Sequence, residues 1–267
     1  MTKVILQSRL YGSWIERCRT VFQKTLDSLA SGLEVKIKIQ EQVKHGWIKV
    51  DVEGEDETVA INQLRQRFGF IPSSLESLKT PCTLTGYATD VGAVGYGVYV
   101  NIGLAGSSSV DVLLPLHVLR SQLADGEKVS LRKITDTYKI TDNFPLSLRV
   151  TKVEINARKL EAELSDSQIT VFEGWVNDSL ERILAFGISL EDAEEALRRS
   201  MLERDVVGIE SLGFFEHSLI CKLGTQAPGI ISKLGRSLYG IPLHTISPAN
   251  LWLRKRNTLG SEVLSSL

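Results

Sequence analysis

Several kinds of site are missing from the sequence because the residues that would build them are few or badly spaced. Cysteine occurs only at Cys18, Cys82 and Cys221, with no Cys-x-x-Cys pair, so neither a disulfide framework nor a zinc finger is indicated. The four histidines lack the i, i+4 spacing of a helical metal site, and no GxSxG, Cys-His or P-loop signature occurs. We therefore expect buried thiols, no cofactor, no metal and no catalytic residues.

Long apolar runs and an excess of one charge are also missing. No run approaches the roughly 18 residues of a membrane span, and the N-terminal MTKVILQSRLYG lacks the apolar stretch of a signal peptide, so we expect a cytoplasmic protein without a membrane partner. The 31 basic and 32 acidic residues give a formal charge of -1. Any binding to a polyanion must then depend on local patches.

The first 78 residues predict a small α/β domain. Residues 3–9 favour a strand, and apolar residues recur at helical spacing from Ser13 until Gly32. Residues 35–39 and 47–52 alternate in polarity around a His45-Gly46 turn, as the two strands of a hairpin do. Acidic residues 55–57 suit the start of a second helix, which ends at Gly69. The expected order is β-α-β-β-α.

Residues 168–253 predict a second small α/β domain, with a flexible basic tail at 254–267. The expected elements are a strand at 168–175, a helix from a cap at Asn177 or Asp178 through Phe186, a helix opened by the capping box at Ser189, strands at 206–212 and 218–223, a helix at 228–238 and a strand at 241–246. This β-α-β-β-α-β order resembles the ferredoxin-like split βαβ arrangement, and the N-terminal domain shares most of it.

Residues 79–167 have the pattern of a small β-barrel. GYATDVGAVGYGVYVNIG, residues 86–103, alternates in polarity around glycines, as strands that curl tightly do. DVLLPLHVL follows at 111–119, and two more alternating strands, 146–153 and 159–164, flank an Asn156-Ala157 turn. Residues 120–143 lie between these groups, and we expect them to contain a helix inserted into the barrel.

Within this segment GYGVYVNIG resembles the S1 pattern of an aromatic residue, glycine, a small residue, an aromatic residue and valine. LLPLHVL resembles the third S1 strand and the hairpin ending in AELS at 162–165 the last two, although Val112 replaces a usual glycine and the insertion is absent from a minimal S1 barrel. Over its whole length the chain is similar to an archaeal, DUF2110-like family of unknown function. These resemblances imply an α+β multidomain protein in which an S1-like, OB-type barrel is flanked by two ferredoxin-like α/β domains.

The S1 resemblance implies an RNA-binding surface. Tyr96 and Tyr99 would present ring faces on which unstacked bases lie, each worth about 1–3 kcal/mol. Their three-residue spacing puts the rings on opposite faces of a regular strand, so both reach the RNA only if the backbone bulges near Gly97; otherwise one ring fills the barrel. His117, in the third strand, is expected either to contact RNA or to form a structural hydrogen bond. The cations expected at the RNA are Arg132, Lys133, Arg149 and Lys152.

The segment from His217 to Asn257 contains six Lys and Arg residues and no Asp or Glu. It includes a glycine-rich turn between a strand and a helix, and the free amides at that helix start suit a phosphate or the RNA backbone. A turn of this kind needs glycine in any case, so a purely structural role stays open. The candidate phosphate contacts are Lys222, Gly224, Thr225, Gly229, Lys233 and Arg236.

These patterns favour a non-catalytic RNA-binding protein that acts in translation or RNA metabolism, with RNA, the ribosome or RNA polymerase as partners. Similar combinations of S1 and α/β modules occur in translation initiation and transcription elongation factors, which is an analogy of fold. Near-neutral charge and the insertion also fit a module that binds a ribosomal or polymerase protein. A third hypothesis is an enzyme acting on a nucleotide or phosphorylated ligand at the Gly224–Gly229 turn, which a well-formed polar pocket there would favour.

Overall fold

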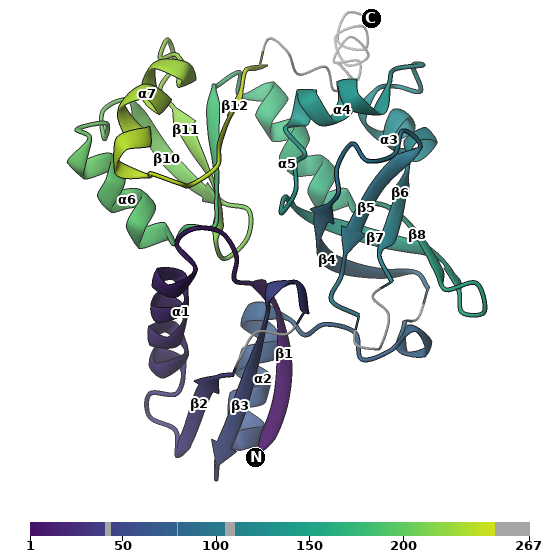
Figure 1. Cartoon of the computed structure of the whole chain (residues 1–267), viewed down its shortest axis with the longest axis vertical. Helices are drawn as coiled ribbons and strands as arrows, with labels where there is room; N and C mark the ends of the chain where they lie inside the picture. The colour runs from purple at the N-terminus through teal and green to yellow at the C-terminus, as the bar shows by residue number, and fades with distance from the viewer. Residues whose placement is uncertain (41–43, 79, 105–109, 249–267) are drawn as a thin grey trace, which may run out of the picture.

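The computed structural model describes residues 1–40, 44–78, 80–104 and 110–248 and arranges them in three parts (Figure 1). A three-stranded sheet with two helices comes first, a closed five-stranded barrel second, and a four-stranded sheet with helices third. The fold class is therefore mixed α+β, as the sequence predicts. In the described part of the chain, every helix is too short or too polar to cross a membrane.

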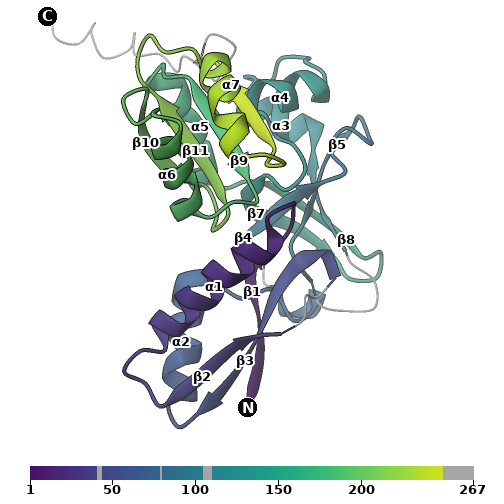
Figure 2. The same cartoon turned by 60° about the vertical axis from the view of Figure 1, so that its left-hand side comes forward.

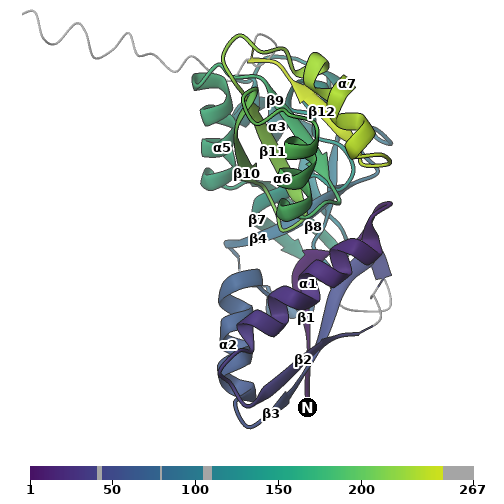
Figure 3. The same cartoon turned by 90° about the vertical axis from the view of Figure 1, so that its left-hand side faces the viewer.

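The N-terminal part confirms the predicted β-α-β-β-α order. Its elements are β1 (Thr2–Arg9), α1 (Ile15–Leu29), β2 (Val35–Ile39), the 3-10 turn η1 (Lys44–Gly46), β3 (Trp47–Gly54), α2 (Glu57–Phe68) and the 3-10 turn η2 (Leu75–Ser77). The strands pair antiparallel in the order β1-β3-β2. Both helices cover the same face of this sheet (Figure 3), where Leu6, Phe22 and Leu64 are fully buried.

The central part is a closed barrel, as the sequence predicts for residues 79–167. Its strands are β4 (Cys82–Thr89), β5 (Gly97–Asn101), β6 (Val112–Pro115), β7 (Pro145–Glu154) and β8 (Lys159–Leu164). They close in the order β4-β5-β6-β8-β7, with β6 and β8 parallel and the other pairs antiparallel. Glycine is needed at position 97, because a Cβ there would lie 2.4 Å from the Leu114 carbonyl oxygen.

The insertion contains two helices, and one of them begins earlier than expected. α3 (Leu116–Leu123) follows β6 directly, and α4 (Leu131–Tyr138) confirms the helix predicted for residues 120–143. The sequence assigned residues 111–119 to one strand, which is wrong beyond Pro115. Leu119 and Leu123 recur at helical spacing and pack into the core that the barrel shares with the insertion, so burial favours a helix there.

The C-terminal part corrects two predicted elements. Its helices and strands are α5 (Asp166–Asn177), β9 (Arg182–Phe186), α6 (Leu190–Arg199), β10 (Val206–Ser211), β11 (Glu216–Cys221), α7 (Ala227–Ser237) and β12 (Leu243–Ile246). The strand predicted at 168–175 is helix α5, whose N-cap Ser165 accepts the Gln168 N–H. The helix predicted at 177–186 contains strand β9 instead. The order β-α-β-β-α-β does occur, but its first strand is β9 and its first helix is α6, whereas the predicted first strand and the helix after it are wrong.

Both faces of the C-terminal sheet are covered. The strands pair antiparallel in the order β10-β11-β9-β12, and α6 and α7 cover one face (Figure 2). α5 lies between the other face and the barrel (Figure 1), where Phe144 of the barrel part contacts both Phe172 and Phe186. Helix α5 therefore belongs to the same core as the barrel. The tail predicted at 254–267 lies outside the described residues.

Candidate functional site

An open pocket of about 840 Å³ lies on the outer face of the barrel, and we call it the tyrosine pocket. Strands β5, β6 and β8 form its floor, and the β4–β5 loop and the β7–β8 turn contribute its ends. Its lining residues are Asp90, Tyr96, Tyr99, Val110, Asp111, Leu113, Arg158, Lys159, Leu160 and Glu161.

Both tyrosines reach this pocket without a bulge. β5 pairs with β6 in regular register from Gly97, so Tyr99 points outward while Val98 and Val100 are buried. Tyr96 precedes the strand and is 55% exposed, so strand alternation does not fix its direction. The two hydroxyl oxygens are 2.8 Å apart, and the rings meet edge to face at 6.3 Å. The bulge expected near Gly97 is absent from this ladder, and neither ring fills the barrel.

The charges of the tyrosine pocket nearly cancel. Arg158 and Lys159 bring two cations, and three carboxylates oppose them at the rim and floor. One of these carboxylates, Asp111, accepts a hydrogen bond from the Asn101 amide at 2.7 Å. The hydrogen bond with Tyr96 and partial burial raise the pKa of Tyr99, which keeps that phenol neutral at pH 7. The pocket therefore offers two aromatic rings and little net charge to attract a phosphate.

The other residues predicted to contact RNA do not gather around the tyrosines. His117 is exposed in the first turn of α3, and Arg132 and Lys133 lie on α4. On β7, Arg149 Nε lies 2.7 Å from a Glu163 oxygen and Lys152 Nζ lies 2.5 Å from a Glu154 oxygen, so both charges are paired. The pocket is instead lined by Arg158 and Lys159, which were not among the predicted RNA contacts although their place at the turn before β8 was visible in the sequence.

The predicted phosphate site lies at the start of α7. A shallow pocket of about 520 Å³ there includes Lys222, Gly224 and Thr225, whereas Gly229, Lys233 and Arg236 lie farther along the helix. The Ala227 N–H at the helix start donates to a Glu181 carboxylate oxygen at 2.6 Å. Because this carboxylate occupies the amide and repels anions, it weakens the phosphate prediction and the enzyme hypothesis attached to it.

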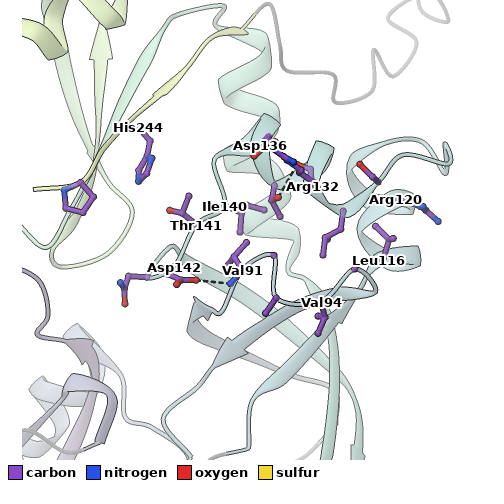
Figure 4. A pocket seen from close by; sticks show the side chains of 18 residues that line it. Val91, Val94, Leu116, Arg120, Arg132, Asp136, Ile140, Thr141, Asp142 and His244 are labelled. Carbon is purple, nitrogen blue, oxygen red and sulfur yellow. Dashed lines mark hydrogen bonds and ion pairs between the residues drawn. The ribbon is translucent and has the colours of Figure 1, made fainter.

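A further cavity, of about 1060 Å³, lies between the barrel, the insertion and the C-terminal sheet (Figure 4), and we call it the interdomain cleft. The β4–β5 loop forms one wall, α3, α4 and the segment before β7 form a second, and Pro242 and His244 at β12 form a third. Since these segments are far apart along the chain, no local sequence pattern predicts the cleft.

The three parts meet at a polar cluster, here called the junction, in which Trp47, Tyr87 and Glu216 are buried and Arg9 and Tyr11 are half-buried. The Arg9 guanidinium carbon lies 5.1–5.8 Å from the ring centroids of the two tyrosines and the tryptophan. Tyr11 donates a hydrogen bond to a Glu216 carboxylate oxygen at 2.6 Å, and Glu216 is fully buried. Burial raises the pKa of Glu216 to about 7, although the Tyr11 hydrogen bond and Arg9 oppose this shift.

Two of the three thiols are buried as expected, and the third is not. Cys18 and Cys221 are buried and Cys82 is half-buried, and all three are free. Burial raises the pKa of Cys18 to about 12 and that of Cys221 to about 11, so both are unreactive thiols at neutral pH. Within the described ranges, no group of three His, Cys, Asp or Glu side chains could hold a metal ion.

The fold and its cavities define the class, a three-part α+β protein built around a closed five-stranded barrel. Family models match the chain in three consecutive stretches: the DUF2110 N-terminal domain at residues 3–74, the DUF2110 central domain at 78–176 and the DUF2110 C-terminal domain at 180–246. The chain therefore belongs to the DUF2110 family.

Comparison with individual proteins adds little. None of the curated proteins matches the chain. Among solved structures, the uncharacterized protein MJ1198 from Methanocaldococcus jannaschii is similar, with 12% identity over 33% of this chain and 95% of that chain and a TM-score of 0.23. A TM-score this low supports no conclusion about fold or function.

Proposed function

We propose that the central part is an S1-type OB barrel and that the sheets on either side are ferredoxin-like. The barrel order β4-β5-β6-β8-β7, with one parallel pair, supports the first assignment. Orders β10-β11-β9-β12 and β1-β3-β2, with their helices on one face, support the second. We keep the first domain boundary near 78 and move the second from 167 to about 178, because α5 shares the barrel core.

We propose that the protein is a non-catalytic binder of single-stranded RNA and that the tyrosine pocket holds the bases. The observation that carries this proposal is that Tyr96 and Tyr99 line one open pocket and that neither ring is part of the barrel core. An exposed ring beside a half-buried one on a barrel surface is a platform for stacking bases, because every base has a flat face. Translation or RNA metabolism is the process that the S1 resemblance suggests.

The charges of the pocket predict how this binding depends on salt. Two cations, Arg158 and Lys159, stand at the pocket and can each displace about one counterion from the RNA. The logarithm of the affinity should then fall with the logarithm of salt with a slope of only about -1.4. A shallow slope of this kind distinguishes stacking from the steep salt dependence of a basic RNA-binding patch.

The test is fluorescence anisotropy of a labelled mixed-sequence single-stranded RNA, titrated with the full chain at low and moderate salt. Replacing both rings, Tyr96→Ala with Tyr99→Ala, should weaken binding at least about 30-fold, since each stack contributes about 1–3 kcal/mol. Tyr239→Ala is the matched control, because Tyr239 is 85% exposed at the end of α7 and outside the tyrosine pocket.

Two results would overturn the proposal. Equal weakening by the Tyr239 control would mean that any exposed ring on the surface contributes, and the pocket would have no special role. No binding by the wild-type chain even at low salt would remove RNA as the partner. That second result would favour the protein-interaction hypothesis, for which the nearly neutral charge is the supporting observation.

A further inference from the structure

The tyrosine pocket and the interdomain cleft share one wall. This wall is the β4–β5 loop, whose ends, Asp90 and Tyr96, line the tyrosine pocket, while residues 91–95 between them line the cleft. On the cleft side, Leu116 donates its N–H to the Tyr96 carbonyl at 2.7 Å. An RNA strand that extends from the Tyr96 ring toward the cleft therefore has to cross this loop.

The shared loop has small residues and is hydrogen-bonded to the insertion. Its sequence is Val-Gly-Ala-Val-Gly, and a Cβ built on Gly92 or Gly95 would meet no heavy atom within 4 Å. Small residues with open space above them let the backbone of a ligand pass closely. The Val91 N–H donates to an Asp142 carboxylate oxygen at 2.9 Å, which ties the loop to the insertion. The loop between the two cavities therefore has no side chain at Gly92 and Gly95 to block a ligand and is anchored to the insertion at Val91.

The opposite end of β5 is closed by the N-terminal part. The Trp47 indole N–H donates to the Asn101 side-chain oxygen at 2.8 Å, and its ring meets Tyr87 of β4 at 5.5 Å. Trp47 is nearly fully buried in this contact. An RNA strand that stacks on Tyr99 is therefore blocked by the N-terminal part in one direction, beyond the end of β5. In the other direction it reaches the β4–β5 loop, where Gly92 and Gly95 have open space around them.

The cleft offers groups that suit a nucleobase. Val94, Leu116 and Ile140 form apolar walls, and Thr141 and His244 face each other from the insertion and β12 (Figure 4). The Thr141 hydroxyl oxygen is buried and has no hydrogen-bond partner among the described residues. An unpaired buried hydroxyl costs free energy, and a ligand hydrogen bond would recover this cost once the Thr141 side chain turns its covered oxygen toward the cleft.

His244 adds a neutral hydrogen-bonding edge. Its ring packs against Phe186, with the two ring centroids 5.8 Å apart. Burial, with a smaller effect of the Lys139 charge, lowers the pKa of His244. The ring is therefore neutral at pH 7 and presents one donor and one acceptor, as the edge of a base requires.

The charges that line the cleft cancel, so the cleft suits an uncharged base better than several phosphates. Two arginines and two aspartates line it, so its charge is balanced. Arg120 is occupied, because its Nε donates to the Val129 carbonyl at 2.7 Å. The Arg132 side chain is 90% exposed and lies 3.5 Å from the exposed Asp136, a weak pair that a phosphate can replace.

We propose that the RNA strand held by the tyrosine pocket continues over the β4–β5 loop into the interdomain cleft, where the next nucleotides contact Arg132, Thr141 and His244. This extension rests on the proposed function. It makes the insertion and the C-terminal part components of the RNA site, and it sets a longer minimum length of RNA than the barrel face alone needs.

The test compares a short and a long labelled oligouridylate, of about 4 and 12 nucleotides, which span much of the range of roughly 4–16 nucleotides per OB-type barrel. In anisotropy titrations of the full chain, Arg132→Ala with His244→Ala should weaken binding of the long RNA about five- to tenfold, as loss of a charged contact and a hydrogen bond predicts. Binding of the short RNA should not change.

Two further variants keep the test specific. Thr141→Val removes the unpartnered hydroxyl with little change of shape, and it should also weaken only the long RNA. Lys24→Ala, on the exposed side of α1 and outside both the cleft and the tyrosine pocket, removes one positive charge and should leave the affinities for both RNAs unchanged. Unfolding temperatures check that each variant is folded, and that of Thr141→Val should equal or exceed the wild-type value because an unpaired buried hydroxyl is removed.

The outcomes separate the extension from the proposed function. If the cleft variants weaken the long RNA alone, the extension is supported. If they change neither RNA while Tyr96→Ala with Tyr99→Ala weakens both, the extension is wrong and the tyrosine pocket stands alone. If the wild-type chain binds neither RNA, the proposed function and the extension are both overturned.

Discussion

The tyrosine pocket and the junction use the same kind of side chain for different purposes. Tyr96 and Tyr99 line an open pocket and hydrogen-bond to each other. Tyr11 and Tyr87 lie against the Arg9 guanidinium, and the Tyr11 hydroxyl is bound to the buried carboxyl of Glu216. Aromatic rings at the junction hold three parts of the chain together, whereas those of the pocket leave their surface to a ligand.

This comparison shows that burial and hydrogen-bond partners, more than residue type, separate a structural tyrosine from a candidate binding residue. A hydroxyl bound to a buried charge is worth about 1.5–3 kcal/mol, whereas a bond at the surface contributes little because water replaces it. We therefore expect changes at the junction to lower stability and changes at the pocket to lower affinity. The predictions below test that division.

The largest expected effect is a change in the pH dependence of stability at the junction. The pKa of Glu216 is raised to about 7, so its contribution to stability is complete below the unfolded pKa of 4.5 and is lost as pH rises through 7. Glu216→Gln removes this dependence. Relative to the wild type, its free energy of unfolding should rise by about 3 kcal/mol between pH 4.5 and pH 7.5.

Only the difference between variant and wild type reveals this effect. Burial lowers the pKa of His217, next along β11, from 6.5 to about 4. Its contribution is complete above pH 6.5 and is lost as pH falls, so in the wild type it offsets Glu216 between about pH 4.5 and 6.5. Urea unfolding of Glu216→Gln and of the wild type between pH 4.5 and pH 7.5 measures the difference between their free energies of unfolding. Parallel profiles would mean that Glu216 titrates normally.

A smaller effect is expected when single hydroxyls are removed. Tyr11→Phe leaves the buried Glu216 carboxyl without its 2.6 Å donor and should lower the free energy of unfolding by about 1–3 kcal/mol. Tyr99→Phe removes a hydroxyl from the tyrosine pocket and should change the free energy of unfolding by less than about 0.5 kcal/mol. Urea midpoints with unchanged m-values measure both, and equal losses would remove the distinction between the two regions.

The sequence predicts the N-terminal part better than the C-terminal part because the two sheets are buried differently. β2 alternates between exposed and buried side chains, which produces the period of two that a strand shows in sequence. All five residues of β9 are buried because the sheet is covered on both faces, so RILAF has no alternation and also suits a helix. In α5, the β-branched residues favoured a strand, but the packing of Phe172 and Trp175 stabilises a helix.

The candidate site could be predicted only in part. The two tyrosines were found through the S1 resemblance, but the way they meet depends on where the partner strand ends. β6 ends at Pro115, opposite Gly97, and continues as α3, so β5 cannot extend to Tyr96. Thr141, His244 and Glu216 meet their neighbours through segments far apart in the chain, which leaves no pattern in a single sequence.

The smallest expected effect separates the ring of Tyr96 from its hydroxyl. Tyr96→Phe keeps the ring and removes only an exposed hydrogen bond to Tyr99, so stability should change by less than about 0.5 kcal/mol. Affinity for RNA should also stay within about twofold, because stacking needs the ring face alone. Tyr96→Ala, measured beside it by anisotropy, should lose at least about fivefold. If Phe weakens binding as much as Ala does, the hydroxyl is the contact, and the pocket recognises its ligand by hydrogen bonding instead of stacking.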